Sequence, residues 1–229
     1  MDRQPRLSPF RDSLPEEFPR PDVNPYVASH RAFGEEVLPA SDAPAWRGRW
    51  AELFGRDAPL HVEVGTGNGF YFSGMAALHP EWNWIGIEIR FKRIVLTAMK
   101  VRAAGLGNAR VVRYDGERLD ELFEPGSLAG MHVNHPDPWS RRSQAKHRMI
   151  DRPFAEMAAR LLASGAELRL KTDFRPHVET LVRVSDGLPL RIKSILTDAV
   201  PWRDDIVTNY QRKALARGAP VHAALFRRS

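Results

Sequence analysis

A regular alternation of short apolar runs with helix-like stretches is the feature that most constrains this chain. Apolar runs at residues 60–64, 84–88, 109–114, 129–135 and 166–172 predict strands. Apolar positions at helical spacing predict helices at residues 70–78, 91–104, 154–162 and 176–184. Strands and helices that alternate at this spacing form a parallel, doubly wound sheet, so the sequence predicts an α/β fold.

The C-terminal part of the chain breaks this alternation. Residues 188–195 and 221–226 predict two further strands, and the sequence between them shows no convincing helix. Such a pair most simply forms an antiparallel edge. We therefore expect a Rossmann-like, seven-stranded sheet that is mostly parallel, with an antiparallel C-terminal edge, in one domain over residues 59–229.

The N-terminal part, residues 1–58, has a different character. Residues 1–25 contain six prolines and four arginines, and no helix or strand period survives there. We expect a basic, proline-rich arm that is disordered or loosely docked, which could touch RNA or be a plain tail. Residues 45–54 predict a short helical lead-in, weakened by Gly48.

Composition restricts the class of protein. The net charge of +6 favours an anionic partner, nucleic acid first. The chain has no cysteine, which excludes disulfides and thiolate metal sites and fits a reducing compartment. No apolar run approaches the length of a membrane span, and the first residues lack an apolar signal region. We expect a cytoplasmic protein that binds no metal and no membrane.

An acidic residue lies at the end of each of the five expected parallel strands. The five are Glu63, Glu88, Asp115, Asp137 and Asp173. Each one alone could equally be a helix N-cap. Because ligands bind beyond the carboxyl ends of the strands in an open α/β sheet, the set as a whole predicts a site there.

The glycine loop at residues 65–69 indicates the kind of cofactor. Its spacing is G-x-G-x-G, which differs from the G-x-G-x-x-G of dinucleotide-binding proteins. Gly65 and Gly67 allow close approach of a ligand to the backbone. Glu88 could then accept from ribose hydroxyls, Asp115 from an adenine amino group and Glu63 from an ammonium. An acid-rich pocket suits S-adenosylmethionine better than a dinucleotide pyrophosphate.

The segment Pro136-Asp137-Pro138-Trp139 is the most specific motif of the chain. The two prolines restrict the backbone, so we expect Asp137 on a stiff, extended loop at a strand end. Trp139 could stack on an unpaired base or pack over the loop's own core. A run of basic residues follows, which could bind a phosphate backbone or be a solvated loop.

These motifs resemble those of bacterial tRNA (guanine-N7)-methyltransferases, in the same order, over roughly residues 60–226. The resemblance rests on the glycine loop with Glu63, on Gly86-Ile87-Glu88, on Pro136-Asp137-Pro138-Trp139, on Lys146-His147-Arg148 and on Thr172-Asp173. It implies a seven-stranded class I methyltransferase fold, S-adenosylmethionine as methyl donor with S-adenosylhomocysteine as product, and a guanosine in the variable loop of tRNA as acceptor.

The resemblance also implies roles for particular residues. Asp137 would be the catalytic residue. The cofactor would be bound by Glu63, Gly65, Gly67, Glu88, Asp115 and Asp137. The substrate would be bound by Arg141, Asp173, Thr208 and Gln211, and RNA by Arg142, Lys146, His147 and Arg148. Nothing in the sequence decides between a monomer and a homodimer.

The chain departs from the family pattern at four positions. The family usually has an aromatic residue where His135 stands, a basic residue and a histidine at Ser143 and Gln144, and a glutamate at Gln211. Two alternatives follow: a methyltransferase acting on an exocyclic amine of another RNA base, or a degenerate tRNA-binding protein without turnover. A dinucleotide oxidoreductase is disfavoured by the glycine spacing.

Overall fold

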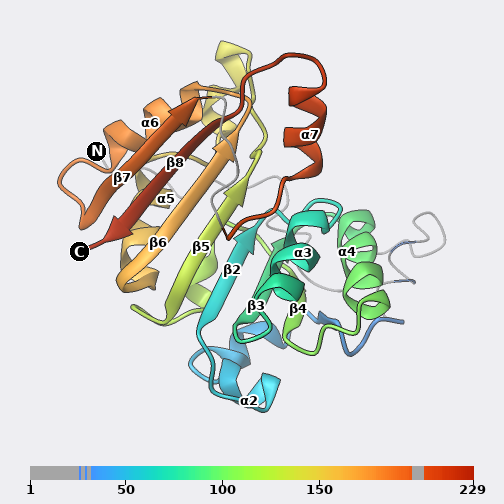
Figure 1. The fold of residues 1–229 in the computed structure, drawn as a ribbon. Coiled ribbons are helices and arrows are strands. Elements are labelled where there is room, and N and C mark those ends of the chain that lie inside the picture. Colours follow the sequence, from blue (N-terminus) through green and yellow to red (C-terminus); the bar gives the residue numbers. More distant parts are fainter. Residues whose placement is uncertain (1–25, 27–28, 30–31, 198–203) are drawn as a thin grey trace.

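The computed structural model describes residues 26, 29, 32–197 and 204–229, and one mixed β-sheet runs through it (Figure 1). The strands stand in the order β1-β4-β3-β2-β5-β6-β8-β7. They are β1 Val37–Leu38, β2 Leu60–Val64, β3 Asn83–Glu88, β4 Ala109–Arg113, β5 Leu128–Asn134, β6 Leu162–Thr172, β7 Leu190–Thr197 and β8 His222–Arg228.

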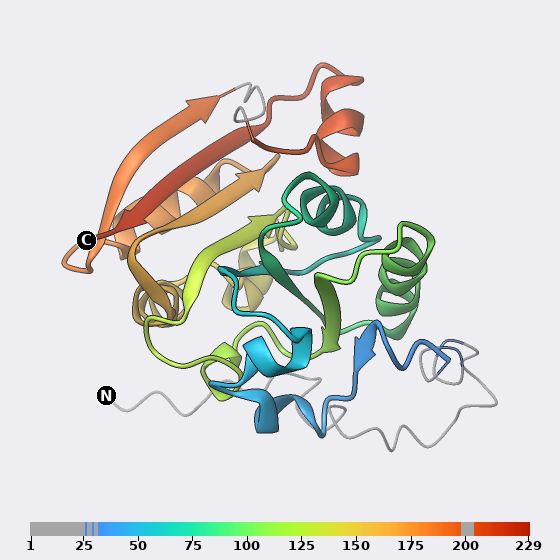
Figure 2. The same ribbon diagram turned by 60° about the horizontal axis from the view of Figure 1, so that its bottom comes forward.

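The seven expected strands are all present, and the first strand is an addition. β1 comes from the region expected to be a lead-in and pairs in parallel with β4, so the sheet has eight strands (Figure 2). A run of two residues carries no period, so β1 exists because β4 offers it a free edge. The expected arm at residues 1–25 lies outside the described residues.

Helices cover both faces of the sheet (Figure 1). The α-helices are α2 Trp50–Phe54, α3 Phe70–Leu78, α4 Phe91–Ala103, α5 Arg152–Leu161, α6 Pro176–Val184 and α7 Asn209–Leu215, and the 3-10 helices are η2 Ala43–Trp46, η3 Leu119–Glu121 and η4 Arg142–His147. The four helices expected at the centre of the chain are confirmed within two residues at each end as α3, α4, α5 and α6.

Two apolar cores separate the layers. On one face, Trp84 of β3 packs with residues of α3 and α4 such as Phe72 and Ile94. On the other face, the next residue of β3, Ile85, joins the core that contains Phe154 of α5 and the apolar side of α6. Successive residues of a strand point to opposite faces. A strand with helices on both faces is therefore apolar along its centre, as β3 is between Asn83 and Glu88.

The C-terminal strands form the expected antiparallel edge. β8 inserts between β6 and β7 and is antiparallel to both. The expectation that no helix lies between them was wrong, because α7 precedes β8. The hydroxyl of Thr208 caps this short helix by accepting a hydrogen bond from the backbone N–H of Gln211 at 2.9 Å.

The lead-in helix expected at residues 45–54 is divided in two. Gly48 has a φ of 76°, which is the left-handed conformation, and it separates η2 from α2. The indole nitrogen of Trp50 donates to the carbonyl of Leu122 at 2.9 Å, which fastens α2 beneath the sheet. The prediction of one continuous helix in this region was therefore wrong.

The carboxyl ends of the parallel strands β2 to β6 meet at one edge of the sheet. In open α/β sheets, ligands bind at this edge. Within the described ranges, no helix is long and apolar enough to cross a membrane. The same residues contain no group of three side chains that could hold a metal ion.

Candidate active site

The glycine loop between β2 and α3 leaves its backbone open on one side. Gly65 and Gly67 have φ values of 81° and 54°, and a Cβ atom placed on either would meet no atom within 4 Å. Gly69 serves packing, because a Cβ there would lie 2.7 Å from the Cα of Thr97 in α4. The first two glycines thus provide room for a ligand, and the third lets the loop lie against α4.

Glu88, at the end of β3, organises this loop. One carboxylate oxygen accepts from the backbone N–H of Gly67 at 3.0 Å, and the other accepts from Ile89 at 2.9 Å and Arg90 at 3.0 Å. Burial raises the pKa of Glu88, and these three N–H donors act in the opposite direction. The carboxylate is fixed beside the glycine backbone and is 9% exposed, which suits a group that accepts from ligand hydroxyls.

Glu63 is the most deeply buried acid of the site. One carboxylate oxygen accepts from the side-chain amide of Asn134 at 2.9 Å, while Oε2 is buried and has no hydrogen-bond partner in the described part of the chain. Burial raises the pKa of Glu63 to about 8, and the nearby charge of Lys171 acts against that rise. A buried acceptor without a partner is costly, so Glu63 is suited to a cationic ligand group.

Asp115 follows β4 and lies near the same edge. Its side chain is largely buried, and one oxygen accepts from the backbone N–H of Glu117 at 3.0 Å. This hydrogen bond fixes the carboxyl group in the turn and leaves the other oxygen for a ligand. No contact joins Asp115 to Glu63 or Glu88 among the described residues, so the three acids line the edge separately.

The loop that carries Asp137 is rigid but is not simply extended. His135 and Trp139, on either side of it, have φ values of 47° and 38°, a left-handed conformation that costs a non-glycine residue about 1–3 kcal/mol. Asp137 itself is exposed, with Arg90 as its ion-pair partner at 3.8 Å. The strained neighbours therefore present one accessible carboxylate next to the end of β3.

Arg148 fixes the backbone of the loop that carries Asp137. Its guanidinium donates to the carbonyls of Pro138 and Trp139, each at 3.0 Å, and lies 4.9 Å from the centre of the Phe174 ring. The sequence placed Arg148 among the RNA contacts. Its hydrogen bonds within the protein instead favour a role in fixing the Asp137 loop, which no local sequence signal indicated.

His135 connects the two substrate segments that the sequence predicted. Its Nδ1 lies 3.3 Å from Asp173, its Nε2 lies 3.0 Å from the hydroxyl of Thr208, and its ring stacks on Tyr210 at 5.5 Å. A carboxylate only accepts, so Nδ1–H donates to Asp173 and Nε2 accepts from the threonine hydroxyl. The sequence marked His135 only as a departure, and this bridging role was missed.

Asp173 and Gln211 differ sharply in their access to solvent. The side chain of Asp173 is 52% exposed, and the hydrogen bond from His135 lowers its pKa, so it is an ionised acceptor at neutral pH. Gln211 is fully buried in the first turn of α7, the helix that Thr208 caps. Of the two, Asp173 is the group that a substrate can reach directly.

The basic segment after Trp139 forms the short helix η4. Arg141, Lys146 and His147 are exposed, and the His147 ring lies 5.4 Å from that of Trp139. Arg142 begins the same helix. Arg141 follows Trp139 by two residues, and neither Arg141 nor Lys146 forms a hydrogen bond with the acidic residues of the site in the described part of the chain.

The residues present fit S-adenosylmethionine. The open backbone at Gly65 and Gly67 provides a cradle that a Cβ would fill, and the unpartnered oxygen of Glu63 provides an acceptor for an ammonium group. Glu88 is fixed where it can accept from hydroxyl groups.

The sheet order and this edge define a class I methyltransferase fold. The solved structure of the aminoglycoside resistance methyltransferase NpmB1 shares it with a TM-score of 0.60, covering 80% of this chain and 93% of that one at 21% identity. At that identity the likeness speaks for the fold alone.

Sequence relatives identify the family. The family model described as "Putative methyltransferase" matches residues 57–224. The tRNA (guanine-N(7)-)-methyltransferase of Bacillus velezensis is 36% identical, covering 80% of this chain and 86% of its own length. That of Geobacillus kaustophilus is 35% identical, covering 83% and 88%. The chain belongs to the tRNA (guanine-N7)-methyltransferase family, whose methyl donor is S-adenosylmethionine.

Proposed function

We propose that this protein transfers a methyl group from S-adenosylmethionine to N7 of a guanosine in the variable loop of tRNA. The observation that carries the proposal is that one sheet edge contains two sets of acidic residues, one buried and one exposed. Buried Glu63 and Glu88 flank the open glycine loop, while exposed Asp137 and Asp173 face outward from the next two strand ends. The first pair suits the cofactor and the second pair suits a base.

Guanine N7 requires little chemical activation. Its lone pair is exposed, so no residue must remove a proton before the methyl group is transferred, and catalysis is mostly alignment of the nucleophile. S-adenosylmethionine supplies an electrophilic methyl group on a sulfonium. The residues of this chain supply orientation.

Asp173 is suited to hold the guanine. The N1–H and N2–H₂ groups of guanine form an edge of donors, which matches the two acceptor oxygens of an ionised carboxylate. The bond from His135 fixes Asp173 and favours its charged form. Adenine lacks this donor edge, so Asp173 provides discrimination between the purines.

Asp137 is suited to the chemical step. Methylation at N7 leaves a positive charge on the ring, and a carboxylate already fixed next to it stabilises the transition state. The loop held by Arg148 keeps Asp137 in place without burying it. Asp137 is therefore proposed as the catalytic residue, with Glu63, Glu88 and Asp115 on the cofactor side.

The cations beyond the loop are proposed to bind the RNA backbone. Arg141, Arg142, Lys146 and His147 follow the catalytic loop directly, where the phosphates beside a bound nucleotide would lie. Trp139 is available for stacking on a base. We place the protein in the cytoplasm, with its tRNA substrate, and as a monomer or homodimer.

The proposal is tested by transfer of labelled methyl groups to unmodified tRNA, with identification of the product nucleoside. The expected product is 7-methylguanosine. A tRNA carrying 7-deazaguanosine at the target position is the matched control and should accept no label. Another methylated nucleoside would refute the guanine assignment, and cofactor binding without transfer would favour a tRNA-binding protein that has lost turnover.

A further inference from the structure

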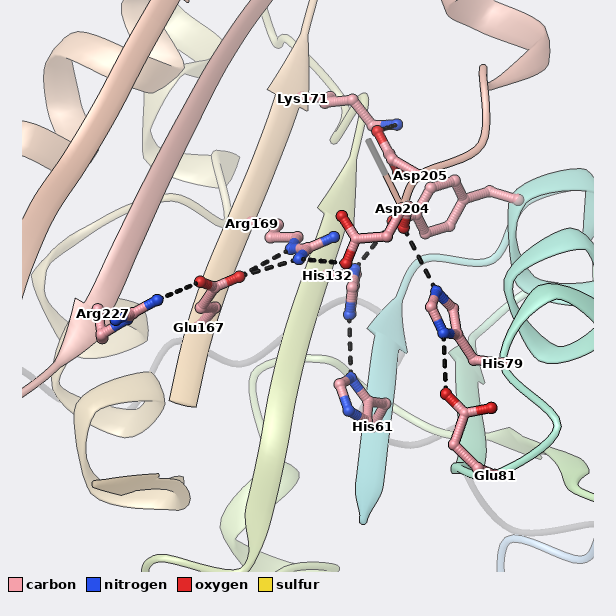
Figure 3. A network of polar contacts seen from close by, with 11 residues as sticks. His61, His79, Glu81, His132, Glu167, Arg169, Lys171, Asp204, Asp205 and Arg227 are labelled. Carbon is pink, nitrogen blue, oxygen red and sulfur yellow. Dashed lines mark hydrogen bonds and ion pairs between the residues drawn. The ribbon is translucent and has the colours of Figure 1, made fainter. Parts of the chain in front are cut away.

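Residues 204–208, here called the strap, cross one face of the sheet before α7 begins. Arg169 and Lys171 lie two residues apart on β6, so they point to the same face, and each holds one aspartate of the strap (Figure 3). Arg169 lies 3.3 Å from Asp204, and Lys171 lies 2.9 Å from Asp205. The strap thus forms two ion pairs with β6.

The two ion pairs differ in burial. The side chains of Lys171 and Asp205 are 2% and 0% exposed, whereas Asp204 is 48% exposed. The ammonium of Lys171 also donates to the carbonyl of Ile206 at 2.8 Å and lies 4.4 Å from the Tyr71 ring centre. Burying a charged pair is costly, and apolar residues would anchor a segment equally well. The pair therefore calls for a role beyond anchoring.

Lys171 of β6 is paired with Asn134 of β5, and the side-chain amide of Asn134 donates to Glu63 at 2.9 Å. The positive charge of Lys171 opposes the rise in the pKa of Glu63 that burial causes. The ammonium of Lys171 thus forms an ion pair with Asp205 and acts electrostatically on Glu63. Glu63 lies in the proposed cofactor site, and Asp205 is three residues before Thr208, which caps α7.

The strap also packs closely on α3. A Cβ on Gly74 would lie 3.1 Å from Ile206, so the absence of a side chain there lets the strap approach the helix that follows the glycine loop. Movement of Asp205 would therefore displace both the start of α7 and a contact with α3. This makes the strap a mechanical connection between the two halves of the site.

We propose that Lys171 is a positioning residue for methyl transfer, which fixes the strap that leads through Thr208 into α7 and at the same time acts on the buried acid Glu63 of the cofactor site. The proposal rests on the proposed function for its substrate side. Lys171 is outside both the cofactor and the substrate residues, and its role is to set the position of the strap relative to Glu63.

Two single substitutions separate the two tasks. Lys171→Met removes the ammonium from both carboxylates, so cofactor affinity and kcat should each fall by about tenfold or more. Asp205→Asn removes the buried ion pair that holds the strap and keeps the positive charge of Lys171. It should leave the cofactor Kd within about twofold and lower kcat at saturating tRNA by about tenfold. Arg169→Met, on the same strand and strap, is the control and should change the cofactor Kd little.

The double variant Lys171→Met/Asp205→Asn distinguishes positioning from anchoring. Removing both charges should restore the melting temperature lost in Lys171→Met, because no uncompensated buried charge remains. We expect cofactor affinity and kcat to stay low in this variant. Recovery of both to within about twofold of wild type would show that the pair only anchors the strap, and would overturn the proposal.

Two measurements keep the test decisive. If the methionine variants do not fold, Asp205→Asn decides alone: a lower kcat with unchanged cofactor Kd supports the proposal, and an unchanged kcat overturns it. Calorimetric binding of S-adenosylhomocysteine reports on the link between Lys171 and Glu63 without turnover. Failure of the wild-type protein to form 7-methylguanosine would refute the proposed function, and the binding data would still test this link.

Discussion

At the scale of single residues, Asp137 combines an accessible carboxylate with a backbone that cannot move freely. Two prolines flank it, the left-handed His135 and Trp139 enclose it, and Arg148 holds the two carbonyls after it. An exposed group contributes little to folding. The rigid loop therefore favours catalysis, and the strained backbone at His135 and Trp139 lowers the stability of the fold.

Asp137→Asn tests this assignment. We expect kcat for transfer to tRNA to fall by about 10²–10³-fold, because the charge that stabilises the methylated ring is lost. The melting temperature should stay unchanged, since the side chain is 69% exposed. Asp120→Asn changes an exposed acid that pairs with Arg160, and it is the control. Undiminished product formation would remove Asp137 from the mechanism.

Glu63→Gln tests the buried acid through pH. The folded pKa, about 8, lies above the ordinary value of 4.5, so the folded state is fully favoured below pH 4.5 and loses stability as the pH rises through about 8. That loss is on the order of 5 kcal/mol at ~1.36 kcal/mol per pKa unit. The variant should therefore unfold at higher denaturant concentration than wild type at pH 9 and match it at pH 4.

The same variant should bind S-adenosylmethionine more weakly, because a neutral amide replaces the acceptor for its ammonium group. Isothermal calorimetry at pH 7.5 measures this, with Glu124→Gln as an exposed-acid control. A Glu63→Gln protein that is more stable and binds equally well would assign Glu63 a purely structural role.

The positions of the acids could be read from the sequence, and their connections could not. An acid after an apolar run marks a strand end, which is local information. The bridge from Asp173 through His135 to Thr208 joins residues 38 and 73 positions apart. It also depends on a left-handed residue before a proline, which the sequence disfavours. Only the folded sheet brings these groups together.

At the scale of elements, α7 is a short helix that depends on its cap. Thr208 accepts from the N–H of Gln211 and contacts His135 with the same hydroxyl. A helix of seven residues is marginal by itself, so the cap and the strap before it determine where the helix begins. This is why an apolar pattern could not predict it, whereas α3 has nine residues and a buried face formed by Tyr71, Phe72, Met75 and Ala76, and it was predicted correctly.

Thr208→Ala removes both contacts of this hydroxyl. We expect the free energy of unfolding to fall by about 1 kcal/mol, as for other N-caps, and KM for tRNA to rise while the cofactor Kd stays constant. Thr208→Ser keeps the hydroxyl and is the matched control. Equal KM values for the alanine variant and wild type would separate α7 from substrate binding.

At the scale of the whole molecule, many exposed arginines lie in ion pairs, and this distinguishes them from Arg141 and Lys146 after the catalytic loop. Arg47, Arg152, Arg160 and Arg175 each face a carboxylate. No ion pair is formed by Arg141 or Lys146 in the described part of the chain. Free cations beside an acidic site are suited to RNA phosphates.

The double variant Arg141→Gln/Lys146→Gln measures this contribution. Each lost phosphate contact should reduce the slope of log K against log salt by about 0.7–0.9, so tRNA binding should weaken and become less sensitive to salt. Arg160→Gln removes a cation that is already paired with Asp120, and its slope should match wild type. An unchanged slope in the double variant would make this segment a solvated surface.

The order of the last two strands has a consequence for how the protein is made. β7 pairs only with β8 in the described sheet, and β8 is the later of the two to leave the ribosome. While residues 222–228 are still inside the exit tunnel, β7 has no neighbour, and β6 lacks one of its two. Insertion of β8 between β6 and β7 therefore completes this edge of the sheet. A nascent chain that stops before β8 lacks that strand and also leaves β7 unpaired, so the sheet loses two strands.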